Sequence, residues 1–161
     1  MATAVSTGAR LRGMWDRQRR LPGGGWIFSR LLRWVVPYSA TIAPRVVELR
    51  PGYARVSMRD RRGVRNHLTS IHAMALANLG ELTTGLALNV GLPDDARAIL
   101  KGIRVEYLKK SRGTITAESA CEVPVTAEET EHEIVGELRD EAGDVVARAT
   151  ATWLVGPRRR S

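Results

Sequence analysis

One acidic residue, Glu81, lies in the middle of an otherwise apolar segment, and it is the side chain best placed to do chemistry. From Ile71 to Val90 the chain is rich in alanine and leucine and contains no proline, which predicts one long helix. Burying a carboxylate without a partner costs several kcal/mol, so a helix that only had to fill a core would be more stable with leucine there. Glu81 is therefore either a surface residue on an open seam or a working group.

The residues just before this helix provide a second chemical feature. The run from Asn66 to Ala73 is polar, and it precedes the first turn, where backbone N–H groups have no intrahelical acceptor. The positive end of the helix dipole lies at the same place. Such donors stabilise a carbonyl oxygen that gains negative charge during a reaction. The sequence thus predicts an oxyanion-binding site at the start of the helix.

The acid and these donors are too far apart on one helix to act on the same atom. Ala73 and Glu81 are eight residues apart, which is about 12 Å along a helix axis. They come together only if two copies of the helix lie side by side, so that the start of one faces the acid of the other. The spacing therefore predicts a homodimer with a shared site, and a homotetramer is the open alternative if such dimers pair.

The segments around the helix have the character of antiparallel strands. Apolar residues point in nearly every direction around the helix, so it is expected to be wrapped on several sides. A stripe of small residues on it allows close approach of either the sheet or a second copy of the helix, and comprises Ala73, Ala77, Gly80, Thr84 and Ala87. The strands are expected at 41–49, 53–60, 97–109, 114–123, 131–139 and 145–155. The predicted fold class is α+β with a curved sheet of five to six strands.

The positive charge of the chain is concentrated at its ends. The 161 residues carry a formal charge of +8, from 25 basic and 17 acidic side chains. Residues 1–36 hold seven arginines and one acid, Asp16, and the tail holds three more arginines. The 15 basic and 16 acidic residues that remain over 37–157 nearly cancel. The body of the domain therefore gives no indication of a nucleic-acid-binding surface.

The chain divides into three parts on these grounds. Residues 1–36 form a basic extension, in which residues 1–24 are expected to be flexible or weakly helical and Trp26 to Val36 to form a short amphipathic helix. This helix either covers part of the core or anchors the protein weakly at a membrane surface. Residues 37–157 form the main domain, and 158–161 are a basic tail.

The residues around the long helix carry a resemblance to a known family. Asn66, the pair His72-Ala73 and Glu81 fall at the offsets at which hotdog-fold thioesterases of the PaaI type have an asparagine, a His-Gly-Gly and a later acid. Residues 37–155 are similar to that family, in which a curved antiparallel sheet wraps a long helix. With the lead-in Pro22 to Ser29, nearly the whole chain resembles an uncharacterised branch, a domain of unknown function.

This resemblance implies the hydrolysis of acyl-CoA or acyl-carrier-protein thioesters, in fatty acid metabolism. It implies that Glu81 is the general base or the nucleophile, that Asn66 orients water or substrate and that the Ala73 N–H binds the thioester oxygen. His72 is expected to shape the loop. The sequence departs from the family where Ala73-Met74 replaces the glycine pair, since Met74 narrows the pocket mouth. A non-catalytic acyl-CoA, fatty-acid or lipid binder is therefore the alternative.

Substrates of this class carry phosphates, so a basic rim is expected. Two clusters of basic residues are candidates: one before the helix, with Arg61, Arg62 and Arg65, and one after a strand, with Lys109, Lys110 and Arg112. Each could bind phosphate or could simply be solvated charge in a turn. The residues assigned to substrate binding are Arg65 and His67 before the helix, Met74 in it, and Lys109, Lys110 and Arg112 after a strand.

Other chemistries have weaker support in the sequence. The three histidines have no metal-ligand spacing, and no glycine pattern for a phosphate or dinucleotide is present. We therefore expect no metal and no cofactor other than the coenzyme A of the substrate. The lone Cys121 excludes an intramolecular disulfide. The expected location is the cytoplasm, with the mitochondrion as alternative because the start is rich in arginine and poor in acids.

Overall fold

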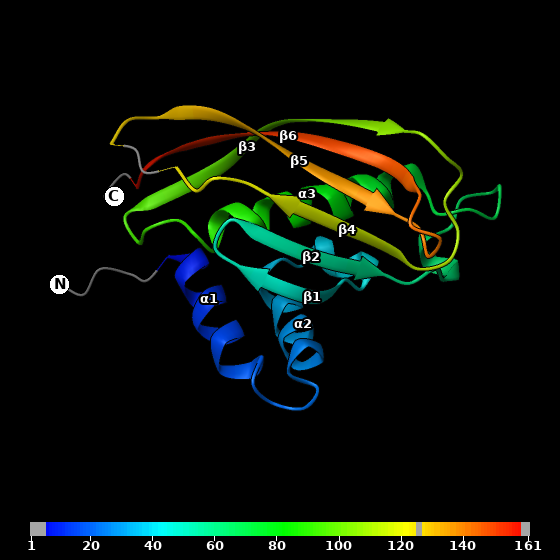
Figure 1. Ribbon diagram of the computed structural model, residues 1–161, viewed down its shortest axis with the longest axis horizontal. Coiled ribbons are helices and arrows are strands. Elements are labelled where there is room, and N and C mark those ends of the chain that lie inside the picture. The colour runs from blue at the N-terminus through cyan, green and yellow to red at the C-terminus, as the bar shows by residue number, and fades with distance from the viewer. Residues whose placement is uncertain (1–5, 125–126, 159–161) are drawn as a thin grey trace.

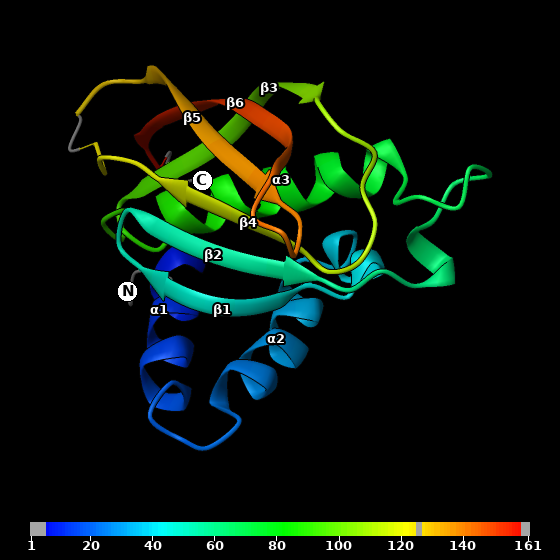
Figure 2. The ribbon, with the colours of Figure 1, turned by 45° about the vertical axis from the view of Figure 1, so that its right-hand side comes forward.

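The structure, a computed structural model, describes residues 6–124 and 127–158. Within them the chain forms one antiparallel sheet of six strands in the order β1-β2-β4-β5-β6-β3. The strands are β1 (Arg45–Arg50), β2 (Tyr53–Met58), β3 (Ala96–Tyr107), β4 (Ile115–Ala120), β5 (Thr130–Arg139) and β6 (Val145–Pro157). The sheet curves around the long helix α3 (Ala73–Asn89), as Figures 1 and 2 show. The predicted α+β hotdog architecture is confirmed.

Small residues let α3 lie close against the inner face of the sheet. A Cβ atom added to Gly80 would stand only 2.5 Å from the Cβ of Ala149 on β6. A Cβ on Gly136 of β5 would stand 3.3 Å from Cγ2 of Thr84. The stripe of small residues was expected to face either the sheet or a second copy of the helix. At Gly80 and Thr84 it faces the sheet. The other end of the stripe, Ala73 and Ala77, is half-buried.

The N-terminal segment forms two helices that pack on this core. The helix α1 (Thr7–Gln18) begins at Ser6, whose Oγ accepts a hydrogen bond from the N–H of Ala9 at 3.0 Å, and Trp15 meets Phe28 of α2 (Gly24–Val35) edge to face at 5.2 Å. Arg12 of α1 donates to the carbonyl of Val90 at the end of α3, at 3.1 Å. Of residues 1–24, predicted to be flexible or weakly helical, 7–18 therefore form a capped and packed helix. The segment 26–36, predicted as a short amphipathic helix, lies largely within α2.

The two edges of the sheet differ in what covers them. The N–H of Val46 on β1 donates to Oγ of Ser29 on α2 at 2.9 Å, so α2 satisfies part of this edge. The other edge is β3, a strand of 12 residues that pairs only with β6 in the part of the chain that the structure describes. A long unpaired edge presents a row of free N–H and C=O groups to another chain. The open edge of the molecule is therefore β3.

The first strand begins later than the sequence predicts. The strand expected from residue 41 begins at Arg45, because residues Ser39–Ile42 form a 3₁₀ turn and Ala43 adopts a left-handed conformation with φ of 48° before Pro44. The ends of the predicted extension and tail, residues 1–5 and 159–161, lie outside the described residues. None of the described helices is long and apolar enough to span a membrane.

Candidate active site

A cavity of about 720 Å³ opens beside α3. Its walls come from α3, from the inner face of β3 and β6, from α1 and from the segment 36–39. The lining is mostly apolar and includes Leu11, Val36, Ala77, Leu82, Leu86, Ala98, Ile103 and Trp153. This size and character suit a small organic ligand with a long apolar part. The N-terminal helix α1 thus contributes to the wall of the cavity.

Glu81 is half-buried in the wall of this cavity. Desolvation by burial raises the pKa of its carboxyl above the ordinary value of 4.5. Among the described residues no basic side chain forms an ion pair with it. An acid with a raised pKa in an apolar cavity is suited to accept a proton near neutral pH. Glu81 is neither in bulk solvent nor part of a structural ion pair.

Asn78 is a polar residue of the cavity that the sequence analysis missed. It lies one turn before Glu81, so both side chains share a face of α3. Its Oδ1 atom is buried and has no hydrogen-bond partner within the described parts of the chain. An unpaired buried amide oxygen is costly, which makes it a candidate to bind a ligand. The i, i+3 spacing between Asn78 and Glu81 was the feature of the sequence that could have identified Asn78 as a site residue.

The start of α3, where the sequence predicts an oxyanion-binding site, is held by hydrogen bonds of His72 and Tyr107. Nδ1 of His72 accepts a hydrogen bond from the N–H of Met74 at 3.0 Å, which makes His72 the N-cap. The N–H of Ala73 donates to no acceptor among the described residues. The hydroxyl of Tyr107 on β3 donates to the carbonyl of Ala73 at 3.0 Å. One N–H group at this helix start is therefore available to an external oxygen.

Asn66 organises the loop before α3. Its Oδ1 accepts hydrogen bonds from the N–H of Leu68 at 2.9 Å, and from the N–H and hydroxyl of Ser70 at 3.2 and 3.1 Å. These bonds hold a turn in which Thr69 has a positive φ of 54°. The oxygen of Asn66 is thus used within its own loop, and the amide nitrogen is the atom left for a substrate.

Two of the cations proposed for phosphate binding are already paired with acids. Arg65 lies 2.6 Å from Asp60, and this contact lowers the pKa of the Asp60 carboxyl. Nζ of Lys109 lies 2.7 Å from Asp140 and 2.6 Å from Asp144, and hydrogen bonds to these acids raise the pKa of Lys109. The pairs of Lys109 join segments far apart in sequence.

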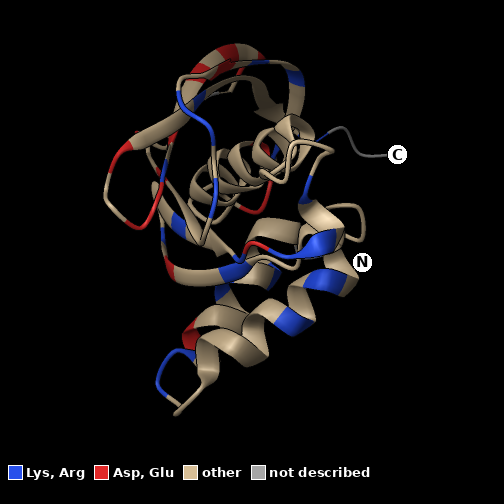
Figure 3. Cartoon of the chain, turned by 90° about the vertical axis from the view of Figure 1, so that its right-hand side faces the viewer, with Lys and Arg blue, Asp and Glu red and all other residues tan. Residues whose placement is uncertain are grey.

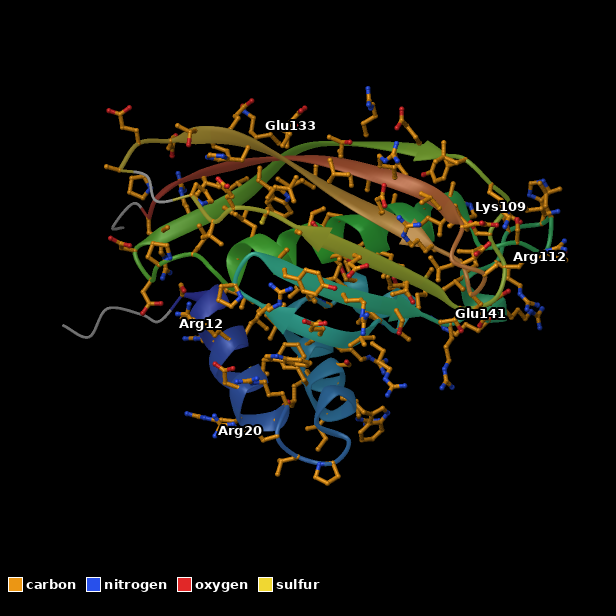
Figure 4. The ribbon with its side chains drawn as sticks, viewed as in Figure 1. Arg12, Arg20, Lys109, Arg112, Glu133 and Glu141 are labelled. Carbon is orange, nitrogen blue, oxygen red and sulfur yellow. The ribbon has the colours of Figure 1, made fainter. Side chains whose placement is uncertain are left out.

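Three further residues proposed for substrate binding lie at the surface outside the cavity. His67, Lys110 and Arg112 are not among its lining residues, and Figure 4 shows Arg112 at the same end of the molecule as Lys109. Within one chain, the structure brings Met74 and Glu81 to the cavity, whereas Asn66, His72 and the basic residues are not part of its lining. Within the described residues, no group of three potential metal ligands occurs.

Solved structures with the same architecture are thioesterase-family hotdog proteins. A genomics protein, APC5556, shares 32% identity over 93% of this chain and 100% of its own, with a TM-score of 0.80. A probable thioesterase of unknown function from Pseudomonas aeruginosa shares 24% over 86% and 97%, with a TM-score of 0.73. The phenylacetic acid degradation protein PaaI from Thermus thermophilus, in a mutant form, shares 23% over 73% and 97%, with a TM-score of 0.62. These matches confirm the resemblance to PaaI-like hotdog proteins.

The family itself is defined by sequence. Residues 24–155 match the family model described as a domain of unknown function, DUF4442, and the chain belongs to this family. The match begins at α2, so this helix is part of the family region and not only of the extension. No curated protein matches the chain.

Proposed function

We propose that the chain hydrolyses acyl thioesters of coenzyme A or an acyl-carrier protein, at a site shared between two copies. The observation that carries this proposal is the position of Glu81, half-buried and unpaired in an apolar cavity of about 720 Å³, with a pKa raised by burial. The apolar walls suit an acyl chain, and among the described residues Glu81 is the only acid in the lining. The thioesterase names of the structural neighbours are consistent with this chemistry.

The second copy is needed because one chain cannot present both parts of the site to one carbonyl. The Ala73 N–H and Glu81 are eight residues apart on α3, which corresponds to about 12 Å. Met74 and Ile103 of the cavity lining are 61% and 38% exposed, and Tyr107, whose hydroxyl bonds the carbonyl of Ala73, is 48% exposed. Beside them lies the open edge of β3. A second copy that pairs along this edge would cover the apolar patch and bring its own helix start toward Glu81.

The proposed reaction uses the carboxylate of Glu81 as general base. It accepts a proton from a water molecule, whose oxygen attacks the thioester carbon, and the amide oxygen of Asn78 accepts the second hydrogen bond of this water. The partner subunit's Ala73 N–H stabilises the oxyanion that forms. When the intermediate collapses, the carbon–sulfur bond breaks and the proton on Glu81 passes to the thiolate. The products are a carboxylic acid and a thiol.

Thiol release from a panel of acyl-CoA chain lengths tests this proposal. The wild type should hydrolyse at least one of them, and Glu81→Gln should lower the rate at least about 100-fold because the general base is lost. Glu133→Gln, at an exposed position of β5 (Figure 4), is the matched control and should leave the rate unchanged. Turnover of no chain length by the folded wild type would overturn the enzymatic proposal.

A non-catalytic acyl-binding protein is the second candidate, and Met74 is the observation that favours it. This side chain lines the cavity and is 61% exposed at its mouth, at a position where the PaaI-type pattern has glycine. A large side chain there restricts the approach of a thioester to the helix start. Co-purified acyl ligands identified by mass spectrometry, together with absence of thiol release, would support this candidate over hydrolysis.

A further inference from the structure

The outward face of α2 is apolar and basic, which is unusual for the solvent side of a helix. Its large apolar residues Trp26, Ile27, Leu31, Trp34 and Val35 are all at least 38% exposed, and Trp34, at 86%, is the most exposed large hydrophobic residue described. At 3.6 residues per turn, Trp34 falls in the middle of the exposed arc. Trp26 and two arginines lie on one side of it, and Ile27, Leu31 and Val35 lie on the other.

The opposite face of α2 fixes this orientation. Phe28 and Leu32 are fully buried in the core. Ser29 accepts a hydrogen bond from Val46 of β1 and donates to the carbonyl of Gly25 at 2.6 Å. Because the helix is held on this side by packing and hydrogen bonds, it cannot rotate to bury Trp34 without breaking the core. The apolar outer face is therefore a stable property of the fold.

Beside this face lies a pocket of about 460 Å³ with five arginines in its wall, which we call the arginine pocket. Its arginines are Arg30, Arg33, Arg45, Arg59 and Arg61, and none of the described acidic residues lines it. Among the described residues these five form no ion pair, in contrast to Arg65 and Lys109. Arg30 stacks over the ring of Trp26 at 5.0 Å, which links the pocket to the apolar face. Figure 3 shows several basic segments on the helices at the bottom of the molecule and most of the acidic segments on the upper strands and loops.

The arginine pocket and the apolar face together favour one class of anionic partner. A small phosphate would explain the arginine pocket but not the exposed Trp34, which needs an apolar environment to gain free energy. The surface of an anionic phospholipid bilayer provides both, because headgroup phosphates attract arginine and tryptophan is favoured at the boundary between headgroups and acyl chains. An amphipathic helix with these residues is suited to lie in the plane of that boundary.

We propose that α2 docks the protein on anionic phospholipid membranes, with a headgroup phosphate in the arginine pocket and Trp34 in the interface. The proposal does not depend on thioester hydrolysis, since none of the five arginines lines the cavity of Glu81. If both proposals hold, docking would place the acyl cavity near a bilayer in which long-chain acyl compounds dissolve.

Co-sedimentation of the full chain with vesicles tests this proposal. One set of vesicles contains phosphatidylcholine alone and the other also phosphatidylglycerol. The wild type should bind the second set, and binding should weaken as salt screens the charges. The double variant Arg30→Gln/Arg33→Gln should bind at least about 10-fold more weakly, since a basic residue at an anionic surface contributes about 1 kcal/mol. Trp34→Ser should also weaken binding.

A control variant makes the outcomes decisive. Arg139→Gln/Arg148→Gln removes the same charge from β5 and β6, which β2 and β4 separate from β1 beside α2 (Figure 1), and should leave binding unchanged. Equal weakening by this control would show a general charge effect and overturn the proposal. So would equal binding to both vesicle types, or binding of soluble glycerophosphate without vesicle binding. A change in molecular mass of Trp34→Ser without vesicle binding by the wild type would assign the face to a second copy instead.

Discussion

At the scale of single residues, the raised pKa of Glu81 gives the clearest dependence on pH. Burial disfavours its carboxylate, so the folded state loses stability as pH rises from the ordinary value of 4.5 through the raised pKa of the native state. Glu81→Gln removes this cost. We expect the variant to melt at higher temperature than the wild type at neutral pH, by roughly 2–4 °C for each kcal/mol gained. The difference should vanish below pH 4.5.

The pH dependence of wild-type activity should report the pKa of the same carboxyl. Because Glu81 acts as carboxylate, kcat/KM should rise with pH and reach half its maximum above the ordinary pKa of glutamate, 4.5. A midpoint at or below that value would indicate a solvated carboxyl and contradict the site.

Asn78 provides a second test at this scale. Asn78→Leu removes the unpaired buried oxygen at similar volume, so the folded protein should be as stable as the wild type or more so. If Asn78 helps to hold the attacking water, kcat should fall about 10-fold, the value of one good hydrogen bond. Steady-state kinetics and thermal melts of the same sample check this. Full activity of the variant would show that Asn78 does not hold the attacking water.

The residue types of the site were more predictable than their contacts. Glu81 could be identified because an unpaired acid in an apolar helix is costly. For His72 the resemblance implied only that it shapes the loop, and its role as N-cap was not predicted. The pairing of Lys109 with Asp140 and Asp144 depends on strands that meet only in the fold. Sequence reasoning therefore assigned Lys109 to a substrate phosphate without detecting its partners.

At the scale of elements, α1 is joined to the end of α3 by close packing at Gly8. A Cβ atom there would stand 1.9 Å from the carbonyl oxygen of Asn89, a backbone atom that cannot move aside easily. Gly8→Ala should therefore displace α1 and lower the melting temperature. Gly13→Ala, in the same helix with nothing within 4 Å, should instead stabilise by up to about 1 kcal/mol through helix propensity. Equal effects of the two changes would contradict the packing of α1.

The strands and α3 could be predicted from periodicity, but α1 could not. Its arginines give it a largely polar sequence, and Leu11 and Trp15 are the apolar residues that it buries. The order of the strands was also beyond sequence reasoning, because β3 pairs with the last strand, β6, and β2 crosses over to β4. Both features depend on contacts between segments far apart in the chain.

At the scale of the whole molecule, the apolar patch beside β3 predicts a homodimer. Ile103→Asp places a charge in that patch, in the cavity wall that also contains Met74, and should halve the mass measured by light scattering and abolish hydrolysis together. The control Arg104→Asp changes the next residue of the strand, on its other face, and should remain dimeric. A wild type with the mass of one chain would contradict the shared site.

Complementation between two inactive variants tests the shared site most directly. Glu81→Gln removes the acid, and Ala73→Pro removes the N–H donor at the first helical position, where proline is tolerated and where His72 already has the extended conformation that proline requires. Each variant alone should be inactive. Co-expression should restore about a quarter of wild-type activity, because half of the dimers are mixed and each mixed dimer has one intact site. Mixed dimers without any recovered activity would show that the acid and the donor act within one chain, and would contradict the account.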